Sequence, residues 1–397
     1  MDSILIFGGG LNQLLLVKSA KDLGYRTIVI DPIPDATAKK IADVFEVIAP
    51  KDYEKTKETA LKYNVKGIVT CQMENPLLIM AQLAEDLNFI FPSQQSVLNA
   101  RNKYLMKECF INAGVACAKG RRIRLDEELK RKYCEEIGFP LIIKPVDSFS
   151  SKGVFKVNKF EEIEGYIASV RNFSSTGDIL IEEFMEGSEV SVEGVTQNKV
   201  TTIVQITDKI ITPYPTAVEM LHIQPSELDA ETQTEVKKLV QKAVNALGLN
   251  NCAIHAEVKI TKTGPKMVEL GARLGGDYIT SHLVPLSTGV NIEAAAIQIA
   301  MGKKPELKHL ISNSAVIEYL KIEAGKKILD IGNYSKMKDD ERVKEVFVFL
   351  NKGEIVQSIT DSTKRVGCVI VQEKNRNSAV NLAHIKCEEL KGYLDTD

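Results

Sequence analysis

Hydrophobic residues in the first hundred positions form short apolar runs that alternate with segments of helical periodicity. The apolar runs have the length and β-branched composition of buried strands, and they are residues 3–7, 26–31 and 65–70. The segments between and after them repeat apolar residues every three or four positions, as an amphipathic helix does, and they are residues 11–24, 53–64 and 75–88. Strands that alternate with helices predict a parallel sheet covered on both faces.

Beyond about residue 119 the pattern changes to strands that follow one another with fewer helices between them. Apolar strand candidates come first, at 139–145, 154–158 and 179–185. Longer segments typical of antiparallel strands follow at 188–209, 251–261 and 265–273, and a helical segment at 229–248 interrupts them. A last group of strands lies at 315–322, 343–350 and 365–372. The chain is therefore predicted to be α/β at its N-terminus and α+β in the remainder.

The composition is that of an ordinary globular protein of two or three domains, with 397 residues, 44% of them apolar and 26% charged. The 51 basic and 53 acidic residues nearly balance, and no basic block suggests nucleic-acid binding. No apolar run approaches the roughly 18 residues of a membrane helix. Seven scattered cysteines without a CxxC pair favour reduced thiols. With no basic segment before the first strand, we expect a cytoplasmic protein without a signal peptide.

Three glycines, Gly8 to Gly10, follow the first predicted strand, as in a dinucleotide-binding turn. The G-x-G-x-x-G fingerprint needs a third glycine where Gln13 stands in this chain, although Asp31 ends the second strand where a ribose-binding acid would lie. An NAD(P)-dependent oxidoreductase is one hypothesis from this segment. A tight strand-to-helix turn accounts for the same glycines, so this segment leaves both interpretations open.

Two acids in the segment HAEVKITKTGPKMVELGAR are spaced so that a hairpin would place them side by side. With a turn at 261–265, Glu257 lies opposite Glu269 on one face. Opposed carboxylates repel unless a cation neutralises them, and Mg²⁺ typically takes one or two carboxylates together with waters and substrate phosphates. Arg273, on the same face, could neutralise a phosphoryl group held there. A solvated hairpin face with incidental acids is the alternative.

Other polar positions have the chemistry of a nucleotide site. Lys144 closes an apolar strand beside the polar loop 147–153, whose N–H groups and hydroxyls could bind the β- and γ-phosphates. Glu182 and Glu189, near the end of the next strand, could accept hydrogen bonds from an adenine amino group and a ribose hydroxyl. Lys103 stands on the helix that leads into this region. Each alone is an ordinary surface charge, but their order along the chain favours nucleotide binding.

In this order the motifs resemble those of the ATP-grasp superfamily, especially its carboxylate–amine ligases, which include the L-amino acid ligases. NKYLMKECFINAGV, FPLIIKPVDSFSSKGV, IEEFMEGSEVSVEG and the hairpin are similar to successive ATP-grasp motifs, and the resemblance covers almost the whole chain. It implies a Rossmann-like pre-ATP-grasp domain with a parallel sheet at 1–100 and an ATP-grasp domain of two α+β lobes at 101–305. It further implies a mobile lid lobe at about 118–186 and a small C-terminal α+β domain at 306–397.

The resemblance also implies roles for single residues. Glu257 and Glu269 would bind Mg²⁺, with Mn²⁺ as a substitute, and Arg273 would steady the transferring phosphoryl group. The family often has asparagine where this chain has Gly271, which leaves open whether one or two ions bind. The residues implied to bind ATP are Lys103 and Lys144 at the phosphates, Ser148, Ser150, Ser151 and Gly153 in the covering loop, Glu182 and the Met185 backbone at the adenine, and Glu189 at the ribose.

The acceptor side has weaker candidates. His255 shares the hairpin face with Glu257, where it is either a substrate contact and catalytic group or a satisfied sheet histidine. The other candidates for substrate contact are Gly275 and Gly276, whose backbone could approach an anion, and Glu219 and His222 in a segment expected to form a wall of the pocket.

The resulting hypothesis is an ATP-dependent carbon–nitrogen ligase. A substrate carboxylate, expected to be that of an amino acid, attacks the γ-phosphate of ATP, and an amine then attacks the acyl phosphate and releases phosphate. An ATP- and bicarbonate-dependent carboxylase of the same superfamily would use the same ATP residues. A nucleotide sensor without catalysis leaves the acids and the arginine without a role. The resemblance implies small-molecule partners, neither nucleic acid nor membrane, and a homodimer, but the sequence does not name the substrates.

Overall fold

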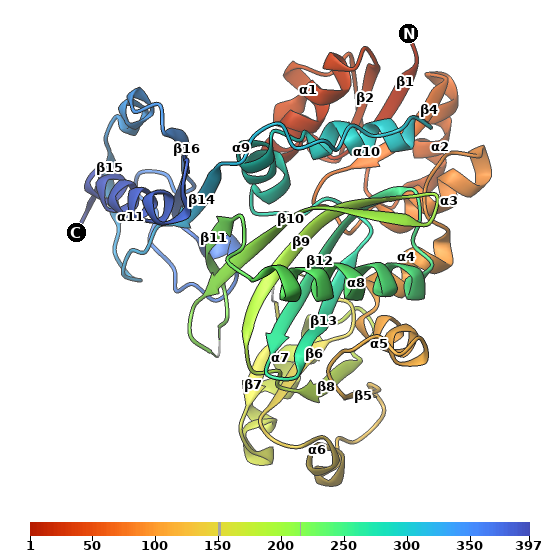
Figure 1. The fold of residues 1–397 in the computed structure, drawn as a ribbon, viewed down its shortest axis with the longest axis vertical. Helices are drawn as coiled ribbons and strands as arrows, with labels where there is room; N and C mark the ends of the chain where they lie inside the picture. Colours follow the sequence, from red (N-terminus) through yellow and green to blue (C-terminus); the bar gives the residue numbers. More distant parts are fainter. Residues whose placement is uncertain (150–151, 215) are drawn as a thin grey trace.

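The computed structural model describes residues 1–149, 152–214 and 216–397 (Figure 1). The first hundred residues form a four-stranded parallel sheet in the order β3–β2–β1–β4, as the alternating pattern predicted. Its strands are β1 (Ser3–Phe7), β2 (Arg26–Asp31), β3 (Val44–Val47) and β4 (Val65–Thr70), and its helices are α1 (Leu14–Asp22), α2 (Tyr53–Lys62), α3 (Leu77–Leu87) and α4 (Gln94–Arg101). The edge strand β3 was not predicted, because its four residues are only partly buried and do not form an apolar run.

The glycine turn after β1 is held by Asp31. Gly9 N–H donates to Asp31 Oδ2 at 2.7 Å, and Ile33 N–H donates to Oδ1 at 2.8 Å. Gly8 has a φ of +95°, a conformation that L side chains rarely adopt, and a Cβ there would lie 2.4 Å from Met73 Sδ. Both oxygens of Asp31 are thus engaged by the backbone of this turn, which favours the turn interpretation over ribose binding.

A separate lobe, at the bottom of Figure 1, contains a four-stranded antiparallel sheet in the order β5–β8–β6–β7. Helix α5 (Lys103–Asn112) leads into it, and its elements are β5 (Gly120–Ile123), α6 (Arg131–Ile137), β6 (Leu141–Pro145), β7 (Phe155–Val157), α7 (Glu164–Asn172) and β8 (Ile179–Glu183). Apolar side chains of the sheet pack with Cys134 of α6 and Val170 of α7 in a core of their own. The lobe therefore has its own hydrophobic core.

The largest sheet is antiparallel and eight-stranded, in the order β13–β12–β9–β10–β11–β14–β17–β16. Its strands are β9 (Ser188–Gln197), β10 (Val200–Ile211), β11 (Glu219–Gln224), β12 (Cys252–Thr261), β13 (Gly264–Gly271), β14 (Ser314–Tyr319), β16 (Val343–Val348) and β17 (Gly367–Glu373). β11 pairs with β14, so this sheet runs across the predicted domain boundary at residue 305. The C-terminal segment adds α11 (Arg376–Gly392) and a small sheet of β15 (Ile328–Ile331) and β18 (Leu394–Thr396).

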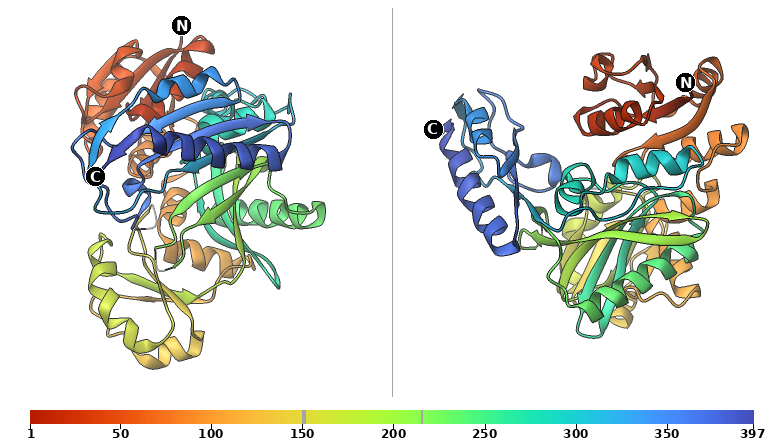
Figure 2. Two further views of the ribbon diagram at one scale, coloured as in Figure 1. Left: turned by 90° about the vertical axis from the view of Figure 1, so that its left-hand side faces the viewer. Right: turned by 45° about the horizontal axis from the view of Figure 1, so that its top comes forward.

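Helices cover the large sheet on both faces. Asp229 caps α8 (Ala230–Leu247) by accepting from Thr232 N–H at 2.8 Å, and the apolar side of α8 packs on β9, β12 and β13. On the opposite face, α9 (Val284–Thr288) and α10 (Ile292–Ala300) share one core with the N-terminal parallel sheet. Figure 2 shows α10 between the two sheets. The predicted fold class, an N-terminal parallel sheet followed by α+β parts, is confirmed.

The helices of the described residues bear on whether this chain could cross a membrane. None of their helices is by itself long and apolar enough to cross a bilayer, whereas the bent pair Ile279–Thr288 and Ile292–Ala300 meets the length and composition criteria when taken together.

A buried carboxyl group on α10 gives a pH-dependent prediction. Glu293 is 2% exposed, and Cys71 Sγ lies 3.6 Å from its Oε1. Burial raises the pKa of Glu293 from 4.5 to about 7. Between these values the unfolded chain ionises while the folded protein stays neutral, so this group lowers stability by about 3 kcal/mol as pH rises through the window.

Glutamine stays neutral at all of these pH values. Glu293→Gln is therefore expected to have the same stability towards unfolding as the parent protein below pH 4.5 and a higher stability above pH 7. Thermal unfolding at pH 5 and pH 8 measures this, because the difference in midpoint between variant and parent should grow with pH. An equal difference at both pH values would contradict the assignment.

Candidate functional site

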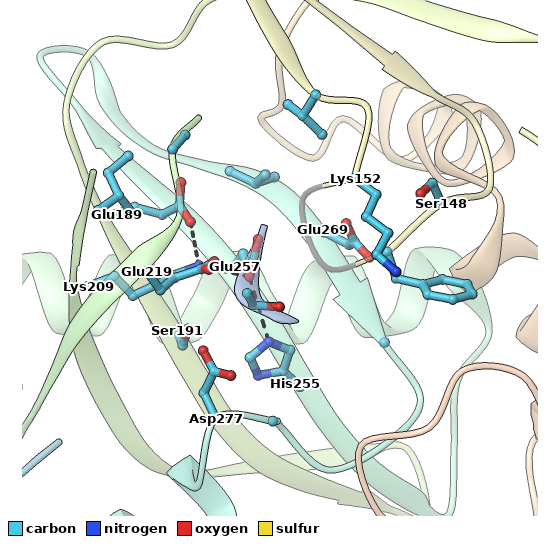
Figure 3. A pocket seen from close by; sticks show the side chains of 18 of the residues that line it. Ser148, Lys152, Glu189, Ser191, Lys209, Glu219, His255, Glu257, Glu269 and Asp277 are labelled. Atoms are coloured by element: carbon cyan, nitrogen blue, oxygen red, sulfur yellow. Dashed lines mark hydrogen bonds and ion pairs between the residues drawn. The ribbon is translucent and has the colours of Figure 1, made fainter. Parts of the chain in front are cut away.

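A cavity of about 620 Å³ collects nearly all of the candidate residues. It is lined by segments that follow β1 and β4 of the N-terminal sheet, by the β5–β8 lobe, by the large sheet and by the C-terminal segment, and Figure 3 shows part of it. The predicted residues that line it are Lys103, Lys144, Ser148, Glu182, Met185, Glu189, Glu219, His222, His255, Glu257, Glu269, Arg273 and Gly276. Two further predicted residues, Ser150 and Ser151, lie outside the described residues.

The hairpin register is as predicted, with Glu257 opposite Glu269 and His255 opposite Gly271. The predicted turn was too long, however, because Thr261 pairs directly with Gly264. A β-bulge between Glu257 and Val258 on one strand and Met267 and Glu269 on the other supplies the extra residue that restores the predicted pairing.

A buried lysine lies at the centre of three pocket acids. Lys209 of β10 has a side chain that is 2% exposed, and its Nζ lies 2.7 Å from Glu189, 2.8 Å from Glu257 and 3.3 Å from Glu219. Burial opposes the charged ammonium, but the three carboxylates outweigh it and raise the pKa of Lys209 well above its usual value. These carboxylates converge on Lys209 in Figure 3. The sequence analysis missed this residue, since a single lysine in an alternating strand carries no signal.

Lys103 and Lys144 also reach the cavity, where each binds a candidate acid. Lys103 Nζ lies 3.0 Å from Glu269 Oε2 and donates to the Ser148 carbonyl at 2.6 Å, so it joins the polar loop to the hairpin. Lys144 forms an ion pair with Glu182, whose other oxygen lies 3.0 Å from Lys107 Nζ. Burial alone would raise the pKa of Glu182, but Lys144 and Lys107 outweigh it and lower that pKa. The Glu182 carboxylate is therefore occupied by two lysines, and Lys107 is a residue that the sequence analysis missed.

The donor set of the hairpin fits a hard divalent cation. Burial alone would raise the pKa of Glu257, but Lys209 and His255 hold it well below its usual range, so the carboxylate is ionised. Among the described residues, no group of three or more His, Cys, Asp or Glu side chains is arranged to hold a metal ion. Two opposed carboxylates that line the cavity suit Mg²⁺, which completes its shell with phosphate and water. Glu257 and Glu269 were expected to repel each other unless a metal cation neutralised them. That expectation was wrong, because Lys209 pairs with Glu257 and Lys103 pairs with Glu269.

His255 is a partly buried, paired histidine that lines the cavity. Its Nδ1 lies 2.6 Å from Glu193 Oε1, and its Nε2 lies 3.8 Å from Glu257 Oε1. Burial lowers the pKa of His255, but Glu193 outweighs this effect and raises it to about 9. The imidazolium is therefore the form at neutral pH, which favours a charge-neutralising role over that of a general base.

Two predicted glycines do not line the cavity. A Cβ at Gly275 would lie 2.7 Å from both Glu193 carboxylate oxygens and 2.8 Å from His255 Nδ1. Gly275 therefore leaves room for the His255–Glu193 pair and does not itself reach the cavity. Gly153 has a φ of +75°, and a Cβ there would lie 2.9 Å from the Phe173 ring. It closes the loop against the lobe.

At one end of the cavity, a residue of the C-terminal segment joins the site. Arg365 donates to both carboxylate oxygens of Asp277, at 2.8 and 2.5 Å, and His222 Nε2 lies 3.1 Å from the same carboxylate. The Arg365 guanidinium also stacks over the Tyr319 ring, with its carbon 3.7 Å from the ring centroid. Asp277 and Arg365 were not predicted, because their 88-residue separation hides the contact.

Profiles of three protein families match this chain. The ATP-grasp domain matches residues 137–281, the ribonucleotide synthetase preATP-grasp domain matches residues 1–101, and the L-amino acid ligase C-terminal domain 2 matches residues 322–391. Together they follow the chain from the parallel sheet through the cavity to the C-terminal segment.

Individual proteins are similar as well. Alanine–anticapsin ligase of Bacillus subtilis (strain 168) is 31% identical over 57% of this chain and 54% of its own length. Dapdiamide A synthase of Enterobacter agglomerans is 30% identical over 54% of this chain and 52% of its own length. The chain thus spans about half the length of these curated relatives. The crystal structure of L-amino acid ligase from Bacillus licheniformis superposes with a TM-score of 0.83 over 100% of this chain and 99% of that one, at 22% identity, which shows a common fold.

Proposed function

This chain belongs to the ATP-grasp superfamily, and we propose that it is an ATP-dependent ligase that joins an amino acid carboxylate to an amine. The observation that carries the proposal is the assembly, in one cavity, of Lys103 and Lys144 with the opposed pair Glu257 and Glu269 and with Arg273. The match to an L-amino acid ligase C-terminal domain, and the ligase names of two relatives, support an amino acid as substrate.

The chemistry proceeds in two steps. A carboxylate oxygen of the first substrate attacks the γ-phosphorus of ATP, the bond to the bridging oxygen breaks, and ADP leaves. The amine nitrogen of the second substrate then attacks the acyl phosphate carbon, loses a proton and expels inorganic phosphate. Phosphoryl transfer requires positioning and charge neutralisation more than covalent help from the protein, and the basic residues of the cavity supply both.

Each group has a defined part in this scheme. Arg273 binds the phosphoryl oxygens as their charge shifts, and Lys103 and Lys144 bind the phosphate chain. Because Lys144 and Lys107 occupy the Glu182 carboxylate, the backbone at Met185, two residues beyond the end of β8, would meet the adenine. Glu257 and Glu269 would hold Mg²⁺, which shields phosphate charge. Ser148, Phe149 and Lys152 line the cavity and would lie over the phosphates.

The acceptor end is formed by four polar side chains and one glycine from three parts of the chain. Glu219 and His222 come from β11, Gly276 and Asp277 follow Arg273, and Arg365 comes from the C-terminal segment. Paired charges of both signs surround this end, so a zwitterionic amino acid fits it better than an apolar amine.

The test is a screen of amino acids, singly and in pairs, for release of ADP and phosphate from MgATP. We expect release to require two amino acids, or one amino acid and an amine, with a dipeptide or amide as product. ADP release that depends on bicarbonate but not on amino acids would favour the carboxylase alternative. Release of AMP would contradict the acyl phosphate route.

A further inference from the structure

A loop of the N-terminal domain lies directly against the loop that carries Arg273. It follows β4, at the edge of the parallel sheet, and Cys71 pairs with Leu274 in a parallel β-bridge. The side chain of Gln72 lies over Gly276, where a Cβ would be 3.6 Å from its Oε1. The two loops therefore run side by side at the phosphoryl end of the cavity.

Glu74 of this loop binds Arg273. Its Oε1 lies 2.5 Å from Arg273 Nε, and Glu74 is 8% exposed. Arg273 Nη1 also donates to the Leu274 carbonyl at 3.0 Å. These two bonds engage the Nε hydrogen and one hydrogen of Nη1, and they orient the planar guanidinium so that its remaining Nη hydrogens can bind an anion.

Gly271 is the residue that leaves space for this contact. A Cβ at position 271 would lie 3.2 Å from Glu74 Oε1, closer than most Cβ contacts in proteins. Any side chain at this position would press on the Glu74 carboxylate and shift it. The glycine at position 271, where the family often has asparagine, and the Glu74 carboxylate beside it therefore depend on each other sterically.

We propose that Glu74 is a positioning residue for the reaction: it holds Arg273 so that the guanidinium meets the transferring phosphoryl group, and Gly271 makes the space that it needs. This inference rests on the proposed function, because it assumes that a phosphoryl group reaches Arg273. It makes the N-terminal domain part of the phosphoryl site, through one carboxylate that lines the same cavity and is engaged by Arg273.

Steady-state kinetics of Glu74→Ala and Glu74→Gln separate positioning from nucleotide binding. Misplacing a catalytic group by about 1 Å can lower the rate about 100-fold. We expect kcat for ADP formation to fall about 100-fold in Glu74→Ala and about 10-fold in Glu74→Gln, which keeps an acceptor oxygen, while KM for ATP changes less than about 3-fold. Glu46→Ala, which removes an ion pair with Lys62 in the same domain, is the matched control and should leave kcat unchanged.

A double-mutant cycle tests the link to Gly271. Gly271→Ala alone should lower kcat several-fold because its methyl group displaces the Glu74 carboxylate. In the Glu74→Ala background the same change should have almost no effect, since its nearest neighbour is gone. Additive effects of the two changes would overturn the role given to Gly271.

Binding of a phosphoryl mimic tests the inference without turnover. Thermal unfolding is measured with MgADP and then with MgADP and aluminium fluoride. Glu74→Ala should keep the stabilisation by MgADP but lose the additional stabilisation by aluminium fluoride. Equal additional stabilisation in variant and parent would overturn the positioning role alone. A parent protein that MgADP does not stabilise would instead overturn the proposed function, and the inference with it.

Discussion

Replacing Glu257 with glutamine is expected to lower ADP formation at least about 1000-fold, because a metal-binding carboxylate at a phosphoryl site contributes several kcal/mol of transition-state stabilisation. Glutamine has the same shape but no charge, so it can still face Glu269 across the hairpin. Lys209 retains its contacts with Glu189 and Glu219 in this variant, so the fold should persist. The measurement is ADP release with MgATP and the substrate pair found in the screen.

The matched control is Glu235→Gln on the exposed side of α8, which should retain full activity. Far-ultraviolet circular dichroism and the thermal midpoint establish that the Glu257 variant is folded. Undiminished ADP formation by Glu257→Gln would reject the assignment of this carboxylate to the metal.

Replacing Lys209 with methionine is expected to have the largest effect on stability. Methionine fills a similar volume but leaves Glu189, Glu219 and Glu257 around a position without positive charge. Removing one partner of a buried ion pair costs about 3–5 kcal/mol, since it strands uncompensated charge. We expect a loss of this size in the free energy of unfolding by urea at pH 8, whereas Lys237→Met on the exposed face of α8 should change little.

The pH dependence of this loss has a defined sign. In the folded parent protein the pKa of Glu257 is depressed below its value in the unfolded chain. The ionised group therefore stabilises the fold at pH values above the unfolded-state pKa, and this stabilisation is lost as pH falls through the folded-state pKa. Without Lys209, burial of Glu257 is no longer offset by this cation, so the pKa of Glu257 should be depressed less. The deficit of Lys209→Met should therefore be largest at pH 8 and smaller at pH 5. Adding Glu257→Gln should recover part of it at pH 8, and a deficit independent of pH would contradict the role of the three acids.

The hairpin illustrates how far sequence patterns predict this site. Strand alternation and a turn between apolar segments placed Glu257 opposite Glu269, and the structure has that pairing. The predicted turn was wrong in detail, since a two-residue turn and a bulge together give the same register as the longer turn that was expected. The shorter turn shifts the pairing by one residue, and the bulge shifts it back. Glu257 and Glu269 therefore still lie opposite each other, as the longer turn would have placed them.

The ion-pair partners were much less predictable. Glu74 lies 199 residues from Arg273, and Asp277 lies 88 residues from Arg365, so no local periodicity links either pair. Gly275 was predicted as a substrate contact, yet it makes room for the Glu193–His255 pair. Glu182 was predicted at the adenine, yet its carboxylate binds two lysines. In each case the type of residue was informative, while its partner depended on packing between distant segments.

Sequence patterns alone predicted the parallel N-terminal sheet apart from its edge strand β3, most of the later strands, the hairpin face with its two acids, and the motifs that resemble those of the ATP-grasp superfamily. These properties follow from local hydrophobic periodicity and from residue spacing within one element. Three contacts became apparent only once the chain was folded: those of Lys209 with three acids, of Glu74 with Arg273, and of Arg365 with Asp277 at one end of the cavity. Charges from distant segments interact only after the sheets pack, because burial removes the water that would otherwise screen them.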